Sequence, residues 1–253
     1  MPSIGDNKAH WDDSHNWRAD GDEWSASWGS TATMWHGSIL PRIAANLPAG
    51  HLLEIACGHG RVTEHLLAHC YRYVGVDLAP SCVAFCRDRF ASRPRAQFAA
   101  TDGASLPGVA DSSIDFAFSW DSLVHAELDA ITGYLHELAR VLRPGGTAFL
   151  HHSNLAEFVD ASGAVTVENP HWRATSVSGQ RVREHAERHG LHVVTQELVQ
   201  WGSVAFNDCL TLLRRPLRAG PGAPPRSLRH PGFAEELGYL RVLDEAYRAS
   251  LRS

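Results

Sequence analysis

The segment Leu52–Arg61 constrains the fold of this chain more than any other stretch. It reads LLEIACGHGR, a short apolar strand followed by two glycines one residue apart, and a helix start follows at Arg61–Glu64. Glycine lets the backbone turn tightly and approach a ligand without a Cβ clash. A Gly-x-Gly turn directly after a buried strand is typical of the first βαβ unit of a nucleotide-binding sheet.

The next apolar strand ends in an acid, which narrows the ligand. Asp77 closes the run YVGVD, 17 residues after Gly60, where a carboxylate can accept hydrogen bonds from both ribose hydroxyls of a nucleoside. The third glycine of a dinucleotide motif is replaced by Thr63, which disfavours a pyrophosphate ligand. Glu54 before the turn would repel an anion and suit a cation. A nucleoside with a cationic tail, such as S-adenosylmethionine (SAM), fits this pattern.

Strand and helix patterns alternate through the middle of the chain, which predicts a Rossmann-like α/β fold. We expect a mostly parallel sheet of seven strands with helices on both faces, and an antiparallel hairpin of the last two strands at one edge. The expected strands lie near 52–56, 73–77, 96–100, 114–120, 147–152, 192–199 and 206–214, and the expected helices near 61–69, 80–91, 129–142 and 178–189.

Composition shifts divide the chain into four parts. Residues 1–48 form a helical arm that holds five of the eight tryptophans, and Trp24, Trp28 and Trp35 have the spacing of one helical face. This face could pack on the main domain, form a lid over a pocket, or both. The domain itself spans 49–216, with an insert near 155–177. A Pro- and Gly-rich linker covers 217–232, and an amphipathic helix covers 233–253.

The first half resembles the class I SAM-dependent methyltransferases. Residues 54–61 are similar to their first motif, Asp77-Leu78 to the ribose-binding acid and its neighbour, and Thr101-Asp102-Gly103 to the segment that meets the adenine amino group. Residues 114–121 resemble strand four, and 138–146, which end in Pro144-Gly145-Gly146, resemble the turn before strand five.

This resemblance implies SAM as cofactor and S-adenosylhomocysteine (SAH) as its product. It also implies a set of residues that contact the cofactor: Trp28, Glu54, Ala56, Gly58, Gly60, Arg61, Asp77, Leu78, Asp102, Gly103 and Trp120.

The segments after strands four and five are expected to meet the acceptor. His125 has a pKa suited to taking a proton near neutrality, and Asp121, four residues earlier, could orient it or pair with a cationic substrate. We predict Asp121, His125 and His152 as catalytic residues. The substrate-binding set is Asp121, His125, His152, Asn154 and Glu157. No three-ligand metal spacing is present, so no metal is expected.

The arm and the two acceptor-side segments resemble a bacterial branch of the family that acts on sugars, glycosides or peptide antibiotics. The insert carries Glu157, Asp160 and Glu168, an acidic rim that would suit a cationic aminosugar. We therefore expect N-methylation of an aminosugar or aminoglycoside in antibiotic biosynthesis. O-methylation of a sugar hydroxyl or another small polar metabolite is the alternative, and a non-enzymatic SAM-binding domain is a further one. A NAD-type oxidoreductase is disfavoured by the missing third glycine.

Bulk properties restrict the partners and the compartment. The net charge is −5 without a basic stripe, which argues against nucleic acid as a partner. No apolar run has membrane-spanning length, and the N-terminus has no apolar signal core. Five cysteines without disulfide spacing favour a reduced, cytoplasmic protein. The C-terminal apolar face is expected to pack on its own domain or to form a homodimer.

Overall fold

The computed structural model describes residues 3–218, 220 and 222–249. Its strands are β1 (Ala49–Ile55), β2 (Cys70–Asp77), β3 (Ala96–Ala100), β4 (Ile114–Ser119), β5 (Leu142–Ser153), β6 (His192–Trp201), β7 (Val204–Arg214) and β8 (Arg226–His230). Its α-helices are α1 (Ile4–Lys8), α2 (Thr31–Met34), α3 (Leu40–Ile43), α4 (Thr63–Leu67), α5 (Pro80–Arg89), α6 (Leu128–Val141), α7 (Gly179–Arg188) and α8 (Phe233–Ala249). Short 3-10 or π segments lie at η1 (Ala9–Ser14), η2 (Asp22–Trp28), η3 (Trp35–Ile39), η4 (Ala44–Asn46), η5 (Leu123–His125) and η6 (Leu155–Phe158).

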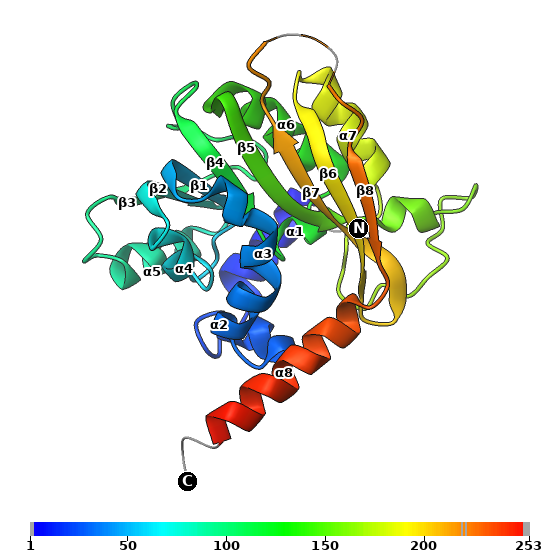
Figure 1. Ribbon diagram of the computed structural model, residues 1–253, viewed down its shortest axis with the longest axis horizontal. Coiled ribbons are helices and arrows are strands. Elements are labelled where there is room, and N and C mark those ends of the chain that lie inside the picture. Colours follow the sequence, from blue (N-terminus) through cyan, green and yellow to red (C-terminus); the bar gives the residue numbers. More distant parts are fainter. Residues whose placement is uncertain (1–2, 219, 221, 250–253) are drawn as a thin grey trace.

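One sheet runs through the whole molecule in the order β3-β2-β1-β4-β5-β7-β6-β8 (Figure 1). The first five of these strands are parallel to one another. β7 runs antiparallel to both β5 and β6, which confirms the predicted hairpin. The carboxyl ends of β1, β2 and β4 therefore meet at one edge, where ligands bind in sheets of this kind.

The sheet has eight strands rather than the seven predicted. The additional strand, β8, lies inside the segment 217–232 that was predicted to be a linker without regular structure, and it pairs in parallel with β6. The five residues Arg226–His230 contain neither proline nor glycine, although Pro225 precedes them and Pro231-Gly232 follow. A short run free of backbone breakers can add to an open sheet edge, and this run does so.

Two apolar clusters cover the two faces of the sheet. On one face, one cluster joins side chains of the arm and α8 with aromatic residues of the sheet. It includes Trp35 of the arm, Phe116 of β4 and Phe149 of β5. On the other face, α6 and α7 bury Leu135, Leu138 and Val182. Burying both faces explains why the parallel strands are apolar along most of their length.

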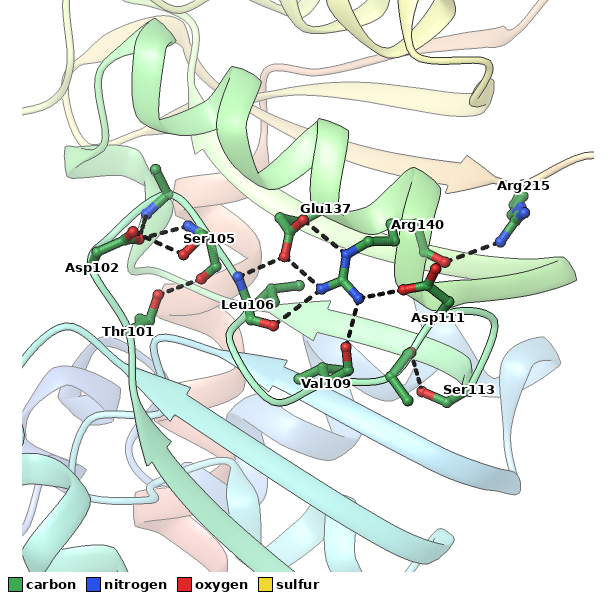
Figure 2. A network of polar contacts seen from close by, with 12 residues as sticks. Thr101, Asp102, Ser105, Leu106, Val109, Asp111, Ser113, Glu137, Arg140 and Arg215 are labelled. Carbon is green, nitrogen blue, oxygen red and sulfur yellow. Dashed lines mark hydrogen bonds and ion pairs between the residues drawn. The ribbon is translucent and has the colours of Figure 1, made fainter.

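The long connection from β3 to β4 is fixed to α6 by one arginine (Figure 2). The guanidinium of Arg140 donates to the backbone carbonyl oxygens of Leu106 and Val109, at 3.2 and 2.7 Å. It also pairs with the carboxylates of Asp111 and Glu137, both at 2.7 Å. Because this connection has no strand partner, these bonds satisfy its backbone and hold it next to the carboxyl end of β3.

The tryptophans of the arm do not share one helical face. The helical turn η2 ends at Gly29, whose φ of +87° only glycine adopts easily, and a Cβ there would lie 2.9 Å from the Asp244 carboxylate. Trp24 is therefore left partly exposed beside a cavity, Trp28 is fully buried, and Trp35 stacks on His65. The arm packs on the domain and also covers the cavity described below.

The C-terminal helix α8 packs against the arm of its own chain (Figure 1). Phe233 is fully buried, and the Asp244 carboxylate accepts hydrogen bonds from Ser30 and Thr33. Tyr247 is exposed, and Leu251 lies outside the described residues. Within the described part of the chain, no helix combines the length and apolarity that crossing a bilayer requires.

Candidate functional site

A cavity of about 500 Å³ lies at the carboxyl ends of β1, β2 and β4, within the size range of small-molecule sites. Its wall combines the glycine turn, the end of β2, the segment after β4 and the arm. Ten of the residues predicted from the sequence line it: Glu54, Ala56, Gly58, Arg61, Asp77, Leu78, Gly103, Trp120, Asp121 and His125.

The glycine turn has the backbone that its sequence predicts. Gly58 and Gly60 have φ values of +54° and +82°, and a Cβ on Gly60 would lie 2.5 Å from the Phe90 ring. Ala56 also has a positive φ, +60°, which is costly for a residue with a side chain. The amides of Ala56 and Cys57 both donate to the Val76 carbonyl, and these bonds hold the turn open at the sheet edge.

Asp77 is held in place by the turn itself. The Gly58 amide donates to one carboxylate oxygen at 2.7 Å, and the Ala79 amide donates to the other at 2.9 Å. Burial raises the pKa of Asp77, although these backbone hydrogen bonds oppose the rise. Each carboxylate oxygen keeps further lone-pair capacity, so the oriented group can accept hydrogen bonds from a ligand diol.

Glu54 is a buried acid at the other side of the turn. One of its carboxylate oxygens accepts hydrogen bonds from the hydroxyl groups of Thr63 and Tyr73. Burial raises the pKa of Glu54 to about 7, and the two hydrogen bonds only partly oppose this. A cationic ligand group beside Glu54 would favour its ionised form.

The arm closes the cavity from outside the sheet. Asn7 donates to the backbone carbonyl of His125 at 3.0 Å, and the Ser81 amide donates to Asp12 at 2.9 Å, so the arm is attached on both sides of the opening. Further along the arm, Trp17 stacks on His59 with ring centres 4.2 Å apart. Aromatic surface over a reaction site excludes water.

His125 occupies the end of the cavity beyond β4. Its Nδ1 lies 3.2 Å from the backbone carbonyl oxygen of Trp172, which can only accept, so Nδ1 carries the proton. Nε2 has no hydrogen-bond partner among the described residues. Burial lowers the pKa of His125, so the neutral imidazole dominates at neutral pH. A neutral imidazole with a free Nε2 can accept a proton.

A buried chain of polar groups supports Asp121. The Asp121 amide donates to His151 Nδ1 at 3.1 Å, so the proton of His151 is on Nε2, which contacts Asp208 at 3.0 Å. Asp208 in turn receives two hydrogen bonds from Arg173. Asp121 has a φ of +56°, and its carboxylate pairs with Arg61 at 3.2 Å across the cavity wall. The buried chain holds Asp121 in this uncommon conformation.

Six residues predicted at the site do not line the cavity: Trp28, Gly60, Asp102, His152, Asn154 and Glu157. Trp28 is fully buried below the wall and donates to Ser38. The Asp102 carboxylate turns back to accept hydrogen bonds from Ala104 and Ser105 in its own loop (Figure 2). Gly60 instead faces the Phe90 ring.

Of the remaining three, His152 lies near the end of strand β5, and Asn154 and Glu157 follow that strand. Both ring nitrogens of His152 are bonded, to Ser153 and Thr211, and burial lowers its pKa to about 4. Asn154 bridges Gly179 and Phe206. Glu157 is exposed. Strand alternation directs His151, rather than His152, towards Asp121.

Sequence reasoning missed several cavity residues, including Ile4, Asn7, Trp11, Trp17 and Arg173. The density of tryptophan in the arm was a signal for the four arm residues among them. Arg173 and its buried partner Asp208 are 35 residues apart, and no local pattern connects them.

Lowering the pH is expected to loosen the arm. Burial lowers the pKa of His15 and of His59, so both are neutral when the arm is closed. Closure is therefore fully favoured above the free-histidine pKa of about 6.5, and it weakens as the pH falls through the lowered values. Acrylamide quenching of tryptophan fluorescence should rise on acidification. His59→Phe, which keeps the stacking, should reduce this rise, and an unchanged pH profile in that variant would contradict the explanation.

The wall fits an adenosyl cofactor with a cationic tail. Asp77 can take the ribose hydroxyls, Leu78 and Ile4 supply apolar surface beside Gly103, and Glu54 is a buried carboxylate available to a cation. Trp120 also lines the wall, and its Nε1 is one of four buried polar side-chain atoms without a partner in the described residues.

Asp77→Ala is expected to weaken SAH binding at least about tenfold, because hydrogen bonds to a charged group contribute about 1.5–3 kcal/mol each. Titration calorimetry would measure this. Asp88→Ala, at an exposed position of α5, is the matched control and should keep the wild-type affinity. Equal SAH affinity in a folded Asp77→Ala protein would exclude the ribose role.

Residues 52–146 match the family described as a methyltransferase domain. A biotin biosynthesis bifunctional protein of Cellvibrio japonicus is 34% identical over 112 residues, covering 44% of this chain and 21% of that protein. A fatty-acid O-methyltransferase of Mycolicibacterium smegmatis is 34% identical over 106 residues, covering 40% and 36%. This chain thus matches well under half the length of these relatives.

The solved structure of the N-methyltransferase NodS from Bradyrhizobium japonicum has the same fold, with a TM-score of 0.56 at 19% identity over 74% of this chain and 97% of that one. The order of strands, the glycine turn and the acid at the end of β2 agree with the family match. Residues 52–146 of this chain thus match a methyltransferase domain and lie within a Rossmann-like methyltransferase fold, and this match implies S-adenosylmethionine as the cofactor.

Proposed function

We propose that this chain is a SAM-dependent methyltransferase that methylates a small acceptor enclosed beneath the arm. The observation that carries the proposal is the position of His125, which has a free Nε2 and lines the same cavity as the Asp77 turn. One cavity thus combines a nucleoside site with a neutral proton acceptor. SAM supplies the methyl group, and the protein has to align the acceptor and manage its proton.

An oxygen acceptor suits the wall best. A hydroxyl group must lose its proton as it is methylated, and His125 Nε2 is available to accept that proton. The ring centre of Trp11 lies 5.6 Å from that of His125, and Trp24 and Trp172 also line the cavity. Such rings pack against flat or apolar faces, including the C–H faces of sugars. We therefore propose O-methylation of a hydroxyl group.

N-methylation of an aminosugar or aminoglycoside in natural-product biosynthesis is the second candidate. The acids predicted to form its rim, Glu157, Asp160 and Glu168, do not line the cavity. Six other carboxylates do: Glu54 and Asp77 at the cofactor half, and Glu23, Asp121, Glu127 and Asp129. Glu23 accepts hydrogen bonds from amides of its own arm, Asp121 is paired with Arg61, and Glu127 accepts hydrogen bonds from Ser176. Asp129 is therefore the acid that favours a cationic acceptor.

Two assays in sequence test the proposal. Thermal unfolding with SAH, and with NAD as the comparison ligand, tests the cofactor, and we expect SAH alone to raise Tm. Transfer of a labelled methyl group from SAM to neutral glycosides, hydroxylated aromatics and aminoglycosides then tests the acceptor. Labelled hydroxylated product supports the leading proposal, and labelled aminoglycoside supports the second. No response to SAH would overturn both, and SAH binding without turnover on any acceptor would favour a non-enzymatic SAM-binding domain.

A further inference from the structure

Arg173 is a buried cation on the cavity wall whose role is not explained by the cofactor. It lies at the end of the 155–177 insert, and its side chain is 5% exposed. Its guanidinium forms a two-point pair with Asp208, through Nε at 2.5 Å and Nη2 at 2.8 Å. Its backbone is fixed as well, because Asn169 bonds to both its amide and its carbonyl at 2.8 Å. The group is therefore rigidly placed before any ligand arrives.

The third nitrogen of this guanidinium is free. Nη1 has no hydrogen-bond partner among the described residues, and it is not one of the unpaired polar atoms sealed from solvent. Since Arg173 lines the cavity, Nη1 is accessible from there. The ring of Trp201, also on the wall, lies 5.5 Å below the guanidinium carbon and covers its other side.

We propose that Arg173 determines acceptor specificity by donating from Nη1 to a carbonyl or carboxylate oxygen of the substrate. This inference rests on the proposed function and names the class of acceptor. A ligand oxygen placed there accepts a hydrogen bond from a guanidinium that is already held in position, so little ordering is needed on binding. A ligand ammonium group would meet an N–H donor and no acceptor, and it is disfavoured.

The charge balance explains why both kinds of oxygen qualify. Asp208 is fully buried and already compensates the charge of Arg173, and His151 is placed as a neutral donor to Asp208. The cluster is thus close to neutral, and it recognises the oxygen by the direction of the N–H groups more than by net charge. The shared feature of the acceptor is therefore an sp² oxygen near the methylated atom.

Three matched probes test this: 3-phenylpropanoate, 3-phenylpropanamide and 3-phenylpropylamine, titrated by calorimetry into the protein saturated with SAH. They share the ring and chain length and differ in the polar end. We expect at least one of the two carbonyl-bearing probes, the acid or the amide, to bind at least about tenfold more tightly than the amine. Whichever of the two binds more tightly identifies the carboxylate or the carbonyl as the natural group.

Arg173→Lys should remove this preference, because lysine can pair with Asp208 but presents no second donor in the fixed direction. Arg42→Lys is the matched control. Arg42 forms the same two-point pair, with Glu197 at 2.7 Å through Nε and Nη2, and lies over the Phe233 ring, but it does not line the cavity. That variant should keep the wild-type preference.

An amine that binds the wild-type protein as tightly as the acid and the amide would overturn the inference, even if Arg173→Lys does not fold. A folded Arg173→Lys protein that keeps the preference would overturn it too. SAH binding without binding of any probe would contradict this inference alone. Absence of SAH binding would contradict the proposed function, and titration of the probes without SAH would then still decide the role of Arg173.

Discussion

Asp208→Ala is expected to lower the free energy of unfolding by about 3–5 kcal/mol, the usual cost of removing one partner from a buried ion pair. Asp208 is fully buried and is bonded to Arg173 and His151. Without it, the Arg173 cation remains in an apolar wall without a counter-charge, and His151 loses the group that fixes its tautomer. Chemical denaturation followed by circular dichroism would measure the change.

The pH dependence distinguishes the charge of Asp208 from its shape. Burial alone would raise the pKa of Asp208, but Arg173 and His151 outweigh it and lower the pKa to about 2. A carboxyl group with a lowered pKa stabilises the fold above its unfolded pKa, and this contribution is lost as the pH falls through the folded value. Asp208→Asn, which keeps the shape, should therefore differ from wild type at pH 7 and converge with it towards pH 2. A constant difference would mean that the charge contributes nothing.

The fold was predictable where periodicity and turn residues agree. The apolar runs that became β1 to β7, the glycine turn and the terminal hairpin all follow from local pattern. β8 was not predictable because its five residues lie directly after a Pro- and Gly-rich stretch and owe their structure to the open edge of β6. The helix break at Gly29 was not predicted because the tryptophan spacing indicates only that a continuous helix would place the three rings on one face. The break depends instead on the close approach of Asp244, which lies on α8 far along the chain.

The candidate site was predictable only in its cofactor half. Asp77 and the glycine turn are close in sequence, and the turn itself orients the acid. On the acceptor side, the structure depends on contacts between distant segments. His125 is oriented by Trp172, and Asp121 is supported through His151 by Asp208. The sequence places an acid and two histidines near the strand ends, but strand alternation and tertiary packing decide which of them reaches the cavity.

His125→Ala is expected to lower kcat about 10²- to 10⁴-fold on a hydroxyl acceptor, the usual contribution of a positioned general base. The imidazole Nδ1 is occupied by the Trp172 carbonyl, so Nε2 is the atom left to take the proton. Burial lowers the pKa of His125, so its imidazole is already neutral at the free-histidine pKa of about 6.5. The wild-type rate should therefore rise with pH in the acidic range and reach its plateau before about pH 6.5. Steady-state kinetics from pH 5 to 8 would measure both effects.

The affinity for SAH separates a chemical role of His125 from a structural one. His125 belongs to the segment after β4 and not to the glycine turn or the end of β2, so the alanine variant should keep the wild-type Kd for SAH within about twofold. His136→Ala, at an exposed position of α6, controls for the loss of an imidazole. If kcat and Kd change together, His125 acts by holding the arm through its contact with Trp11. If kcat is unchanged, His125 is excluded as the base. An amine acceptor predicts a third result, a modest loss of kcat, because a neutral amine attacks without prior removal of a proton.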